Sequence, residues 1–392
     1  SHHALAAEAT YLAAWLEMRL GRAAARASFK RVVRRCQDKC PALAAKARWH
    51  IGYEAFKRKR YREAVTYLGA YAEGDSDPMV RGRGLYWMGR AELGRKRTSA
   101  AIQAFEGALQ AAPLHWYGWL SVHRLRSLGR DPGPVVEAPF PTPASGAVDL
   151  PEGVAFLSAL GLSEDAEQVL RSKEDVIKAQ VEPGQKLEHL VRAYHAIGAP
   201  SRPYRLVAVA HREQLLAPPH PDTAWIWHAA YPRAFESLVV REANRHGLSP
   251  EYLWSIMRQE SAYDPRAVSH ADAIGLLQVM PATAKRIDPS GNLQREDLFR
   301  PVANVRIAAR YNARLLEHYQ GVIPYALAAF NAGEHRVDEW RARAKSKELD
   351  RFVEEIPFDE TRNYVRRVTS HYLRYLFLAN PSGGFPDPGF SP

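Results

Sequence analysis

A repeated helical pattern, in a chain almost free of strand-like alternation, restricts most strongly what this sequence can fold into. Shifting residues 52–68 by 37 positions places small, apolar and basic residues on residues of the same kind. The pairs are Gly52 with Gly89, Phe56 with Leu93, Arg58-Lys59-Arg60 with Arg95-Lys96-Arg97, Ala64 with Ala101, Val65 with Ile102 and Leu68 with Phe105. A period in the mid-thirties is typical of solenoids of stacked helical hairpins. We therefore expect at least two tetratricopeptide-like hairpins, with a more divergent pair around Tyr11–Leu20 and Ala23–Val33.

Two proline-rich stretches divide the chain, one at about Asp131–Pro151 and one at Pro218–Pro221. Such composition is typical of connectors. We expect an all-α chain with a superhelical domain at 1–145, a helical linker domain at 146–230, a C-terminal helical domain at 231–380 and a loose tail at 381–392. The helical candidates after the first connector are Val154–Leu160, Ser163–Ser172, Gln185–Ile197, Ala234–His246, Glu251–Ser261, Pro281–Ile287, Val302–Tyr319, Pro324–Phe330 and Arg362–Leu378.

Positive charge is concentrated in the first third of the chain. Residues 1–130 hold 24 Lys+Arg and 10 Asp+Glu, whereas the remainder holds 30 and 33. Such an excess attracts anionic polymers and membrane surfaces. The clusters Lys57–Arg60 and Arg95–Arg97 nevertheless fall at expected inter-helix turns, and no recognised nucleic-acid motif accompanies them. We favour a solvated rim and expect no nucleic-acid partner.

Other features of the composition limit cofactors and location. Cys36 and Cys40 lack the second ligand pair of a structural zinc site, and the sequence allows either a small disulfide loop or two thiols. We expect no metal and no organic cofactor. No apolar run reaches the roughly 18 residues of a membrane span, which leaves peripheral membrane contact open. The chain starts at Ser1 without a methionine, so export with removal of a signal peptide is allowed.

One expected helix, starting at the cap Ser249 and Pro250, carries an acid on its apolar face. The stripe at i, i+3, i+4 and i+7 consists of Leu253, Ile256, Met257 and Glu260. Asp264-Pro265 disfavours further helix, so Glu260 should lie near the helix end and beside a cleft. Taken alone, a buried structural ion pair is the better interpretation of such an acid.

Three further segments change that interpretation. With Glu260 they form the series Glu260–Pro265 (ESAYDP), Gly275–Pro281 (GLLQVMP), Ala328–Gly333 (AAFNAG) and Ile356–Val365 (IPFDETRNYV). This block, residues 231–378, resembles the soluble lytic murein transglycosylases of glycoside hydrolase family 23, whose strings run roughly ESAF-P-A-S, GLMQ-MP-TA, AYNAG and IPF-ETR-YV. Ala112–Leu120 resembles a segment that closes the α-superhelical region of these enzymes, so the resemblance extends weakly over 40–125.

The resemblance implies a goose-type-lysozyme-like catalytic domain behind a shortened superhelix. It implies a periplasmic enzyme that cleaves the β-1,4 bond between N-acetylmuramic acid and N-acetylglucosamine in peptidoglycan and leaves a 1,6-anhydromuramic end. Glu260 matches the catalytic acid and base, and one acid suffices for this reaction. The positions that match the lining of the glycan cleft are Ser269, Gln278, Met280, Phe330, Asn331, Ala332, Glu360 and Tyr364. The partners implied are glycan strands, with an envelope protein left open for the N-terminal helices.

Departures from the family strings keep two other functions open. Phe330 replaces a tyrosine whose hydroxyl lies near the catalytic acid, so we expect altered tuning of Glu260. Asp272 and Ile274 replace a glycine and a small polar residue. A hydrolytic muramidase would use Asp272 or Glu360 to activate water, and a binding or scaffold protein would present a degenerate enzyme domain.

Several candidate residues also have a purely structural interpretation. Ser269 and Asn331 suit turns, and Gly333 suits a helix stop. Glu360 suits the first turn of the last helix, where negative charge is favoured.

Overall fold

The structure is a computed structural model that describes residues 2–36, 39–136, 139–142, 148–288 and 290–390. Within these ranges it contains 22 α-helices, three short 3₁₀ helices and two isolated β-bridges. The expected all-α class is confirmed. The chain forms two compact units, one of residues 1–133 with 216–218 and one of residues 134–215 with 219–392. The expected boundary between 145 and 146 lies outside the described residues, as does part of the first proline-rich stretch.

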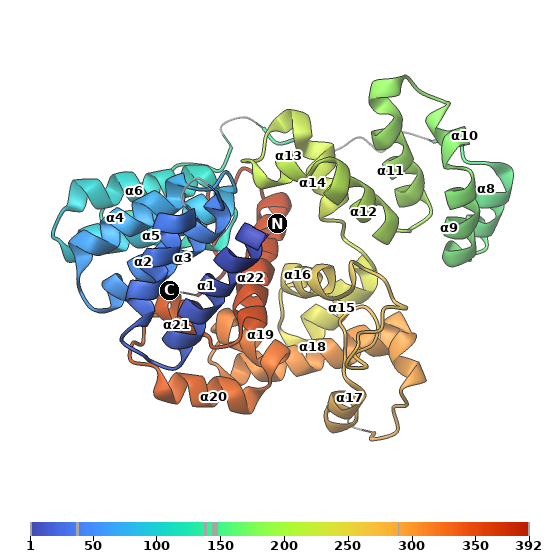
Figure 1. Cartoon of the computed structure of the whole chain (residues 1–392). Coiled ribbons are helices and arrows are strands. Elements are labelled where there is room, and N and C mark those ends of the chain that lie inside the picture. The colour runs from blue at the N-terminus through green and yellow to red at the C-terminus, as the bar shows by residue number, and fades with distance from the viewer. Residues whose placement is uncertain (1, 37–38, 137–138, 143–147, 289, 391–392) are drawn as a thin grey trace. The chain divides into compact units, whose positions relative to one another are not determined.

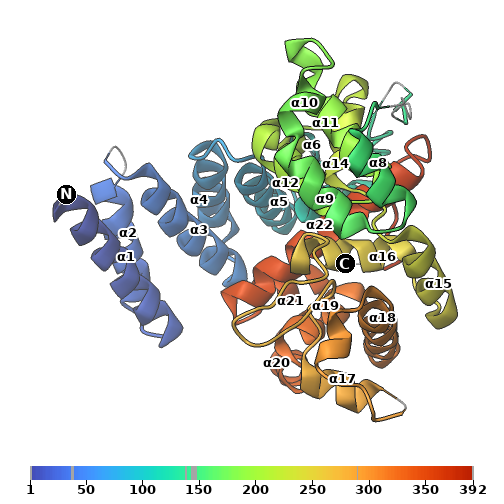
Figure 2. The same ribbon diagram turned by 90° about the vertical axis from the view of Figure 1, so that its right-hand side faces the viewer.

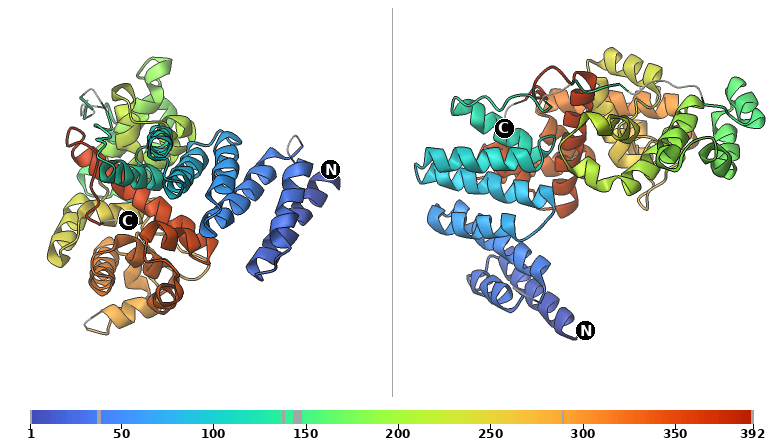
Figure 3. Two further views of the ribbon diagram at one scale, coloured as in Figure 1. Left: turned by 90° about the vertical axis from the view of Figure 1, so that its left-hand side faces the viewer. Right: turned by 90° about the horizontal axis from the view of Figure 1, so that it is seen from above.

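The first unit is a succession of antiparallel helical hairpins. Its helices are α1 (His2–Arg19), α2 (Ala25–Cys36), α3 (Pro41–Lys57), α4 (Tyr61–Glu73), α5 (Pro78–Gly94), α6 (Thr98–Ala111) and α7 (Trp116–Ser127). Each packs on the next in chain order, as Figures 2 and 3 show. The divergent first pair is present as α1 and α2. Between α2 and α3 the structure joins Cys36 and Cys40 in a disulfide, the first of the two states that the sequence allowed.

The 37-residue repeat has a direct packing basis. A Cβ atom on Gly52 of α3 would lie 2.8 Å from the Leu68 side chain of α4. At the equivalent place in the next hairpin, a Cβ atom on Gly89 of α5 would lie 2.7 Å from the Phe105 ring of α6. Only glycine lets these helices approach so closely. The two glycines occupy equivalent positions of the repeat, and so do the two side chains that they face, Leu68 and Phe105. The predicted repeat is therefore confirmed as a structural one.

The turns inside the two hairpins repeat as well. Lys59 and Lys96, 37 residues apart, both have left-handed backbones, with φ of 58° and 62°. The basic clusters around them, Lys57–Arg60 and Arg95–Arg97, lie at the predicted inter-helix turns and consist mainly of exposed residues.

Within the described residues, the second unit begins with seven short helices, the first four of which form a small core of their own. These are α8 (Glu152–Ala159), α9 (Ser163–Ser172), α10 (Glu174–Lys178), α11 (Lys186–Ala196), α12 (Ser201–Ala210), α13 (Arg212–Leu216), whose last residue belongs to the first unit, and α14 (Ala224–Ala230). The core includes Leu170, Ile177, Leu190 and Tyr194.

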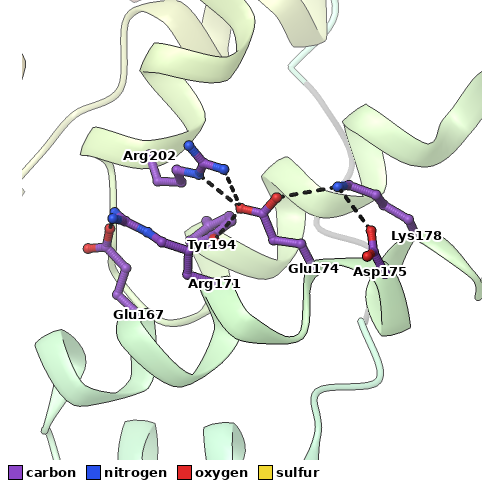
Figure 4. Close-up of polar contacts among 7 residues, drawn as sticks. All are labelled: Glu167, Arg171, Glu174, Asp175, Lys178, Tyr194 and Arg202. Carbon is purple, nitrogen blue, oxygen red and sulfur yellow. Dashed lines mark hydrogen bonds and ion pairs between the residues drawn. The ribbon is translucent and has the colours of Figure 1, made fainter.

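A polar network braces three of these short helices (Figure 4). Glu174 of α10 accepts hydrogen bonds from the Tyr194 hydroxyl of α11 at 2.8 Å and from Arg202 Nε of α12 at 2.9 Å. Lys178 Nζ lies 3.3 Å from its other oxygen. These partners outweigh the opposing effect of burial and lower the pKa of Glu174, so the network is a structural ion cluster.

In the part of the chain that the structure describes, seven further helices accompany one long helix, α22 (Asp359–Ala379). They are α15 (Glu236–His246), α16 (Pro250–Ser261), α17 (Pro281–Ile287), α18 (Pro301–His318), α19 (Ile323–Ala332), α20 (Glu334–Arg343) and α21 (Leu349–Glu355). α16 and α19 both pack against α22 (Figure 1). The helices expected here are confirmed with small shifts at their ends, but α20 and α21 were not expected. α20 is largely charged and α21 spans two turns, so neither has a strong apolar period.

Candidate active site

Helix α16 begins and ends where the sequence predicts. The Ser249 side chain caps it by accepting a hydrogen bond from Tyr252 N at 3.4 Å, and Pro250 takes the first helical position. At the other end Ala262 has a left-handed backbone with φ of 53°, which stops the helix directly after Ser261. Glu260 therefore lies in the last turn.

Glu260 has the apolar surroundings that its spacing predicts. Leu253, Ile256 and Met257 are fully buried, and the Glu260 side chain keeps only part of its surface exposed. In the described part of the chain no cation forms an ion pair with it. Burial raises the pKa of Glu260 to about 7, and the nearby negative charge of Glu360 acts in the same direction. The carboxyl is thus partly protonated at neutral pH.

Tyr364, in the second turn of α22, opposes this effect. Its hydroxyl interacts with the Glu260 carboxylate and so lowers the pKa of that acid. Among the described residues, however, the buried hydroxyl makes no contact with regular hydrogen-bond geometry. We take the interaction to be longer or less aligned than a regular hydrogen bond. Burial and Glu260 both raise the pKa of Tyr364, which stays a hydroxyl donor.

The Gly275–Pro281 loop is held against α16. Ser261 Oγ, next to Glu260, donates a hydrogen bond to Leu276 O at 2.8 Å. Gly275 has φ of +77°, and a Cβ atom there would lie 2.4 Å from Asn304 Nδ2, so this position requires glycine. Gln278 Nε2 donates to Ala267 O and Gly275 O, at 3.1 and 3.0 Å.

Asn304 is a residue that the sequence did not single out. It is fully buried, donates to Ile274 O and Leu298 O, and accepts from Leu277 N at 2.9 Å. Its three hydrogen bonds fix the loop. The available signal was the place of Asn304 on the buried stripe of α18, at i, i+4 and i+7 with Ala308 and Tyr311.

Ser269 and Asp272 have structural roles in the preceding loop. Ser269 Oγ accepts from the backbone N–H groups of Ala271 and Ala273, at 3.2 and 3.0 Å, as its turn interpretation predicts. Asp272 forms a two-oxygen ion pair with Arg295, with a shortest distance of 2.6 Å. Hydrogen bonding to Arg295 lowers the pKa of this exposed Asp272 carboxyl, which makes it a weak base.

A cavity of about 560 Å³ gathers five of the predicted cleft residues. These are Gln278, Met280, Phe330, Asn331 and Ala332. Further lining comes from residues that the sequence did not indicate, namely Thr283, Arg286, Tyr311, Glu334, His335 and Arg336. Most of these were missed because charged residues on helix surfaces normally face solvent. The Phe330 ring lies 5.8 Å from the Tyr311 ring, and Gly333 ends α19 with φ of +93°, as predicted for a helix stop.

Glu260, Ser269, Glu360 and Tyr364 do not line this cavity. They are connected to it through neighbours in the chain. Thr361, next to Glu360, donates a hydrogen bond to Asn331 Oδ1 at 2.6 Å, just as Ser261 joins Glu260 to the loop of Gln278. Glu360 is exposed in the first turn of α22, where its capping interpretation places it. Asn331 lies within α19 and is not a turn residue.

The described residues contain no group of three or more His, Cys, Asp or Glu side chains arranged to hold a metal ion. A search of the same residues finds no helix with the length and apolar character needed to cross a membrane.

Comparison with known proteins places this geometry in a family context. Residues 237–353 match the Transglycosylase SLT domain family. The chain is 37% identical over 153 residues to a putative soluble lytic murein transglycosylase of Haemophilus influenzae, over 38% of this chain and 26% of that protein. It is 33% identical over 159 residues to the soluble lytic murein transglycosylase of Escherichia coli K12, over 39% and 25%. The matched part thus spans about a quarter of the length of these relatives.

Two solved structures resemble nearly the whole chain. An inactive mutant of the lytic transglycosylase Slt of Pseudomonas aeruginosa matches with a TM-score of 0.57 and 23% identity, over 91% of this chain and 56% of the other. The 70-kDa soluble lytic transglycosylase of Escherichia coli matches with a TM-score of 0.57 and 19% identity, over 96% and 63%. The resemblance to soluble lytic murein transglycosylases is therefore confirmed, in sequence for the C-terminal part and in fold for the chain.

Proposed function

We propose that this chain cleaves the glycan strands of peptidoglycan between N-acetylmuramic acid and N-acetylglucosamine, without consuming water. The observation that carries the proposal is the Glu260 carboxyl, whose pKa burial raises to about 7 at the end of α16. An acid of this kind can donate a proton at neutral pH. The names of the relatives support murein as the substrate.

The proposed reaction uses Glu260 twice. The protonated carboxyl first gives its proton to the glycosidic oxygen as the bond to the muramic acid C1 breaks. The resulting carboxylate then takes the proton of the C6 hydroxyl of the same sugar, and the C6 oxygen bonds to C1. The ring closes as a 1,6-anhydro product, and Glu260 is protonated again.

A hydrolase would need a second carboxylate to activate water. Asp272 is held by Arg295 on an exposed loop, and its pKa is lowered. Glu360 is close enough for its charge to act on Glu260 but is itself exposed in the first turn of α22. Neither arrangement favours a water-activating base, so we retain the non-hydrolytic reaction.

The other site residues have proposed roles around this acid. In our proposal the glycan contacts Gln278, Met280, Phe330, Asn331 and Ala332 in the cavity of about 560 Å³. Ser269 supports the adjoining loop. Glu360 and Tyr364 adjust the protonation of Glu260. Phe330 has no hydroxyl with which to bond Glu260. In our proposal the Tyr364 hydroxyl therefore adjusts the pKa of this acid.

The rest of the chain fits an envelope enzyme. We propose a periplasmic location, a superhelical domain at 1–145, a linker domain at 146–230 and a catalytic domain at 231–380. The basic hairpin turns of the first unit suit contact with an anionic wall polymer or an envelope protein.

Mass spectrometry of digested murein tests the proposal. Products one water lighter than a hydrolytic fragment are expected from the wild-type chain, and none from Glu260→Gln. Reducing ends alone would indicate a muramidase. Equal clearing by both proteins would remove Glu260 from the mechanism, and no clearing by either would favour the scaffold function.

A further inference from the structure

A second cavity, of about 630 Å³, lies in the same unit as Glu260 but is lined by none of the site residues described above. It is bounded by α11, α14, residues 231–235, the first half of α16 and the end of α22. α16 contributes Glu251 and Trp254, whereas Glu260 lies in its last turn. The volume is within the range of small-molecule sites.

The walls of this cavity offer flat aromatic faces. Trp225 and Phe235 are partly exposed in it, while Tyr231, Trp254 and Tyr375 form a buried backing. Phe235 has a left-handed backbone with φ of 52°, which is a strained conformation for an aromatic residue. Such strain is typical of functional sites.

The arginines of the lining are paired, whereas the Glu251 carboxylate forms no ion pair among the described residues and accepts a hydrogen bond from Ser249 Oγ at 2.6 Å. Arg192 forms an ion pair with Glu188 in α11, and Arg233 forms one with Glu236 at 3.2 Å. A strongly anionic ligand would therefore find no free counter-charge at these arginines.

Uncharged hydrogen-bonding capacity remains, however. The imidazole of His195 forms no hydrogen bond or ion pair with the described residues, although its backbone carbonyl accepts a hydrogen bond from Gly198 N. The surrounding protein lowers the pKa of His195 and of His228, so both imidazoles are neutral at pH 7. A neutral imidazole offers one donor and one acceptor, as a sugar hydroxyl does.

We propose that this cavity binds a short neutral saccharide, with a pyranose face against Trp225 and Phe235 and hydroxyls bonded to His195 and Glu251. A purely apolar ligand would leave these polar groups unbonded, and an anionic ligand would meet arginines that are already paired. That the natural saccharide is a stretch of murein glycan rests on the proposed function. A strand held here is tethered to the unit that carries Glu260, which raises its local concentration at the cleft.

Titration calorimetry on the full chain tests the site. Glu260→Gln prevents cleavage, and the ligand is a tetramer of N-acetylglucosamine, with maltotetraose and a murein stem pentapeptide for comparison. We expect two saccharides per chain. Adding Trp225→Ala, or the milder His195→Ala, should weaken one binding event by about tenfold or more. His189→Ala, a histidine of α11 outside the cavity lining, should change neither event.

Two results would overturn the inference. One is a stoichiometry of one that neither Trp225→Ala nor His195→Ala alters, with circular dichroism showing that both variants are folded. The other is pentapeptide binding that depends on Trp225, which would make this a peptide site. Murein digestion by the parent chain is scored separately, so failure of the enzymatic proposal is distinguishable from failure of this site.

Discussion

Replacing Tyr364 by Phe tests how the surroundings of Glu260 set its protonation. Burial raises the pKa of Glu260 to about 7, the Tyr364 hydroxyl lowers it, and Glu360 raises it. The hydroxyl favours the charged carboxylate because it can donate a hydrogen bond to it. Removing the hydroxyl should therefore raise the pKa of Glu260 further, and the acid form should persist to higher pH.

The size of this change follows from the contact. A hydrogen bond to a charged group contributes about 1.5–3 kcal/mol in good geometry. The Tyr364 hydroxyl does not meet that geometry, so we take about 1 kcal/mol, or roughly 0.7 of a pKa unit at 1.36 kcal/mol per unit. The alkaline limb of kcat/KM, which reports the general acid in the free enzyme, should move upward by the same amount.

The assay is kcat/KM for release of soluble murein fragments between pH 5 and 9. Tyr372→Phe is the matched control, because Tyr372 lies on the same helix and both tyrosines are 6% exposed. The control limb should not move. An unchanged or lowered limb in Tyr364→Phe, or an equal movement in both variants, would refute the reasoning.

Three further predictions concern other parts of the site. Because the pKa of Glu260 is raised from 4.5 to about 7, ionising it opposes folding, and the penalty grows between these values to at most about 3 kcal/mol. Glu260→Gln should therefore be more stable than the wild type in urea at pH 8 and equal to it at pH 4, and a constant difference would argue against a buried acid. Gly275→Ala should lower the free energy of unfolding by about 3 kcal/mol or more and reduce activity. The reason is that the added Cβ would lie 2.4 Å from Asn304 Nδ2 at a position with positive φ. An unchanged midpoint of thermal unfolding would show that the loop adjusts to the alanine. Asp272→Asn and Arg295→Ala should both keep murein cleavage, because their ion pair is exposed, and loss of cleavage in Asp272→Asn alone would restore the water-activating hypothesis.

The sequence predicted the elements whose local pattern also determines their packing. The 37-residue repeat was visible because both hairpins need a small residue where their two helices approach each other. Gly52 meets this need in one hairpin and Gly89 in the next. The ends of α16 were visible because a serine cap, a proline and an Asp-Pro pair act locally. α20 was missed because a helix with one fully buried side chain, Val337, carries little apolar period.

The candidate site was less predictable because its chemistry depends on contacts between distant segments. Glu260 and Tyr364 are about 100 residues apart, and only the packing of α16 on α22 brings their side chains together. The family strings indicated both residues but not that the Tyr364 hydroxyl adjusts the protonation of Glu260. Asn304 had no such string, although its three hydrogen bonds fix the loop that carries Gln278.

Digestion of murein in water enriched in heavy oxygen tests the central claim most directly. If Glu260 acts alone and the muramic acid C6 oxygen closes the ring, the products released by the wild-type chain contain no oxygen from the solvent. Mass spectrometry of the first soluble fragments should then give the same masses in ordinary and in enriched water. A gain of one heavy oxygen at each new end would show that water attacks the sugar, and would contradict the account.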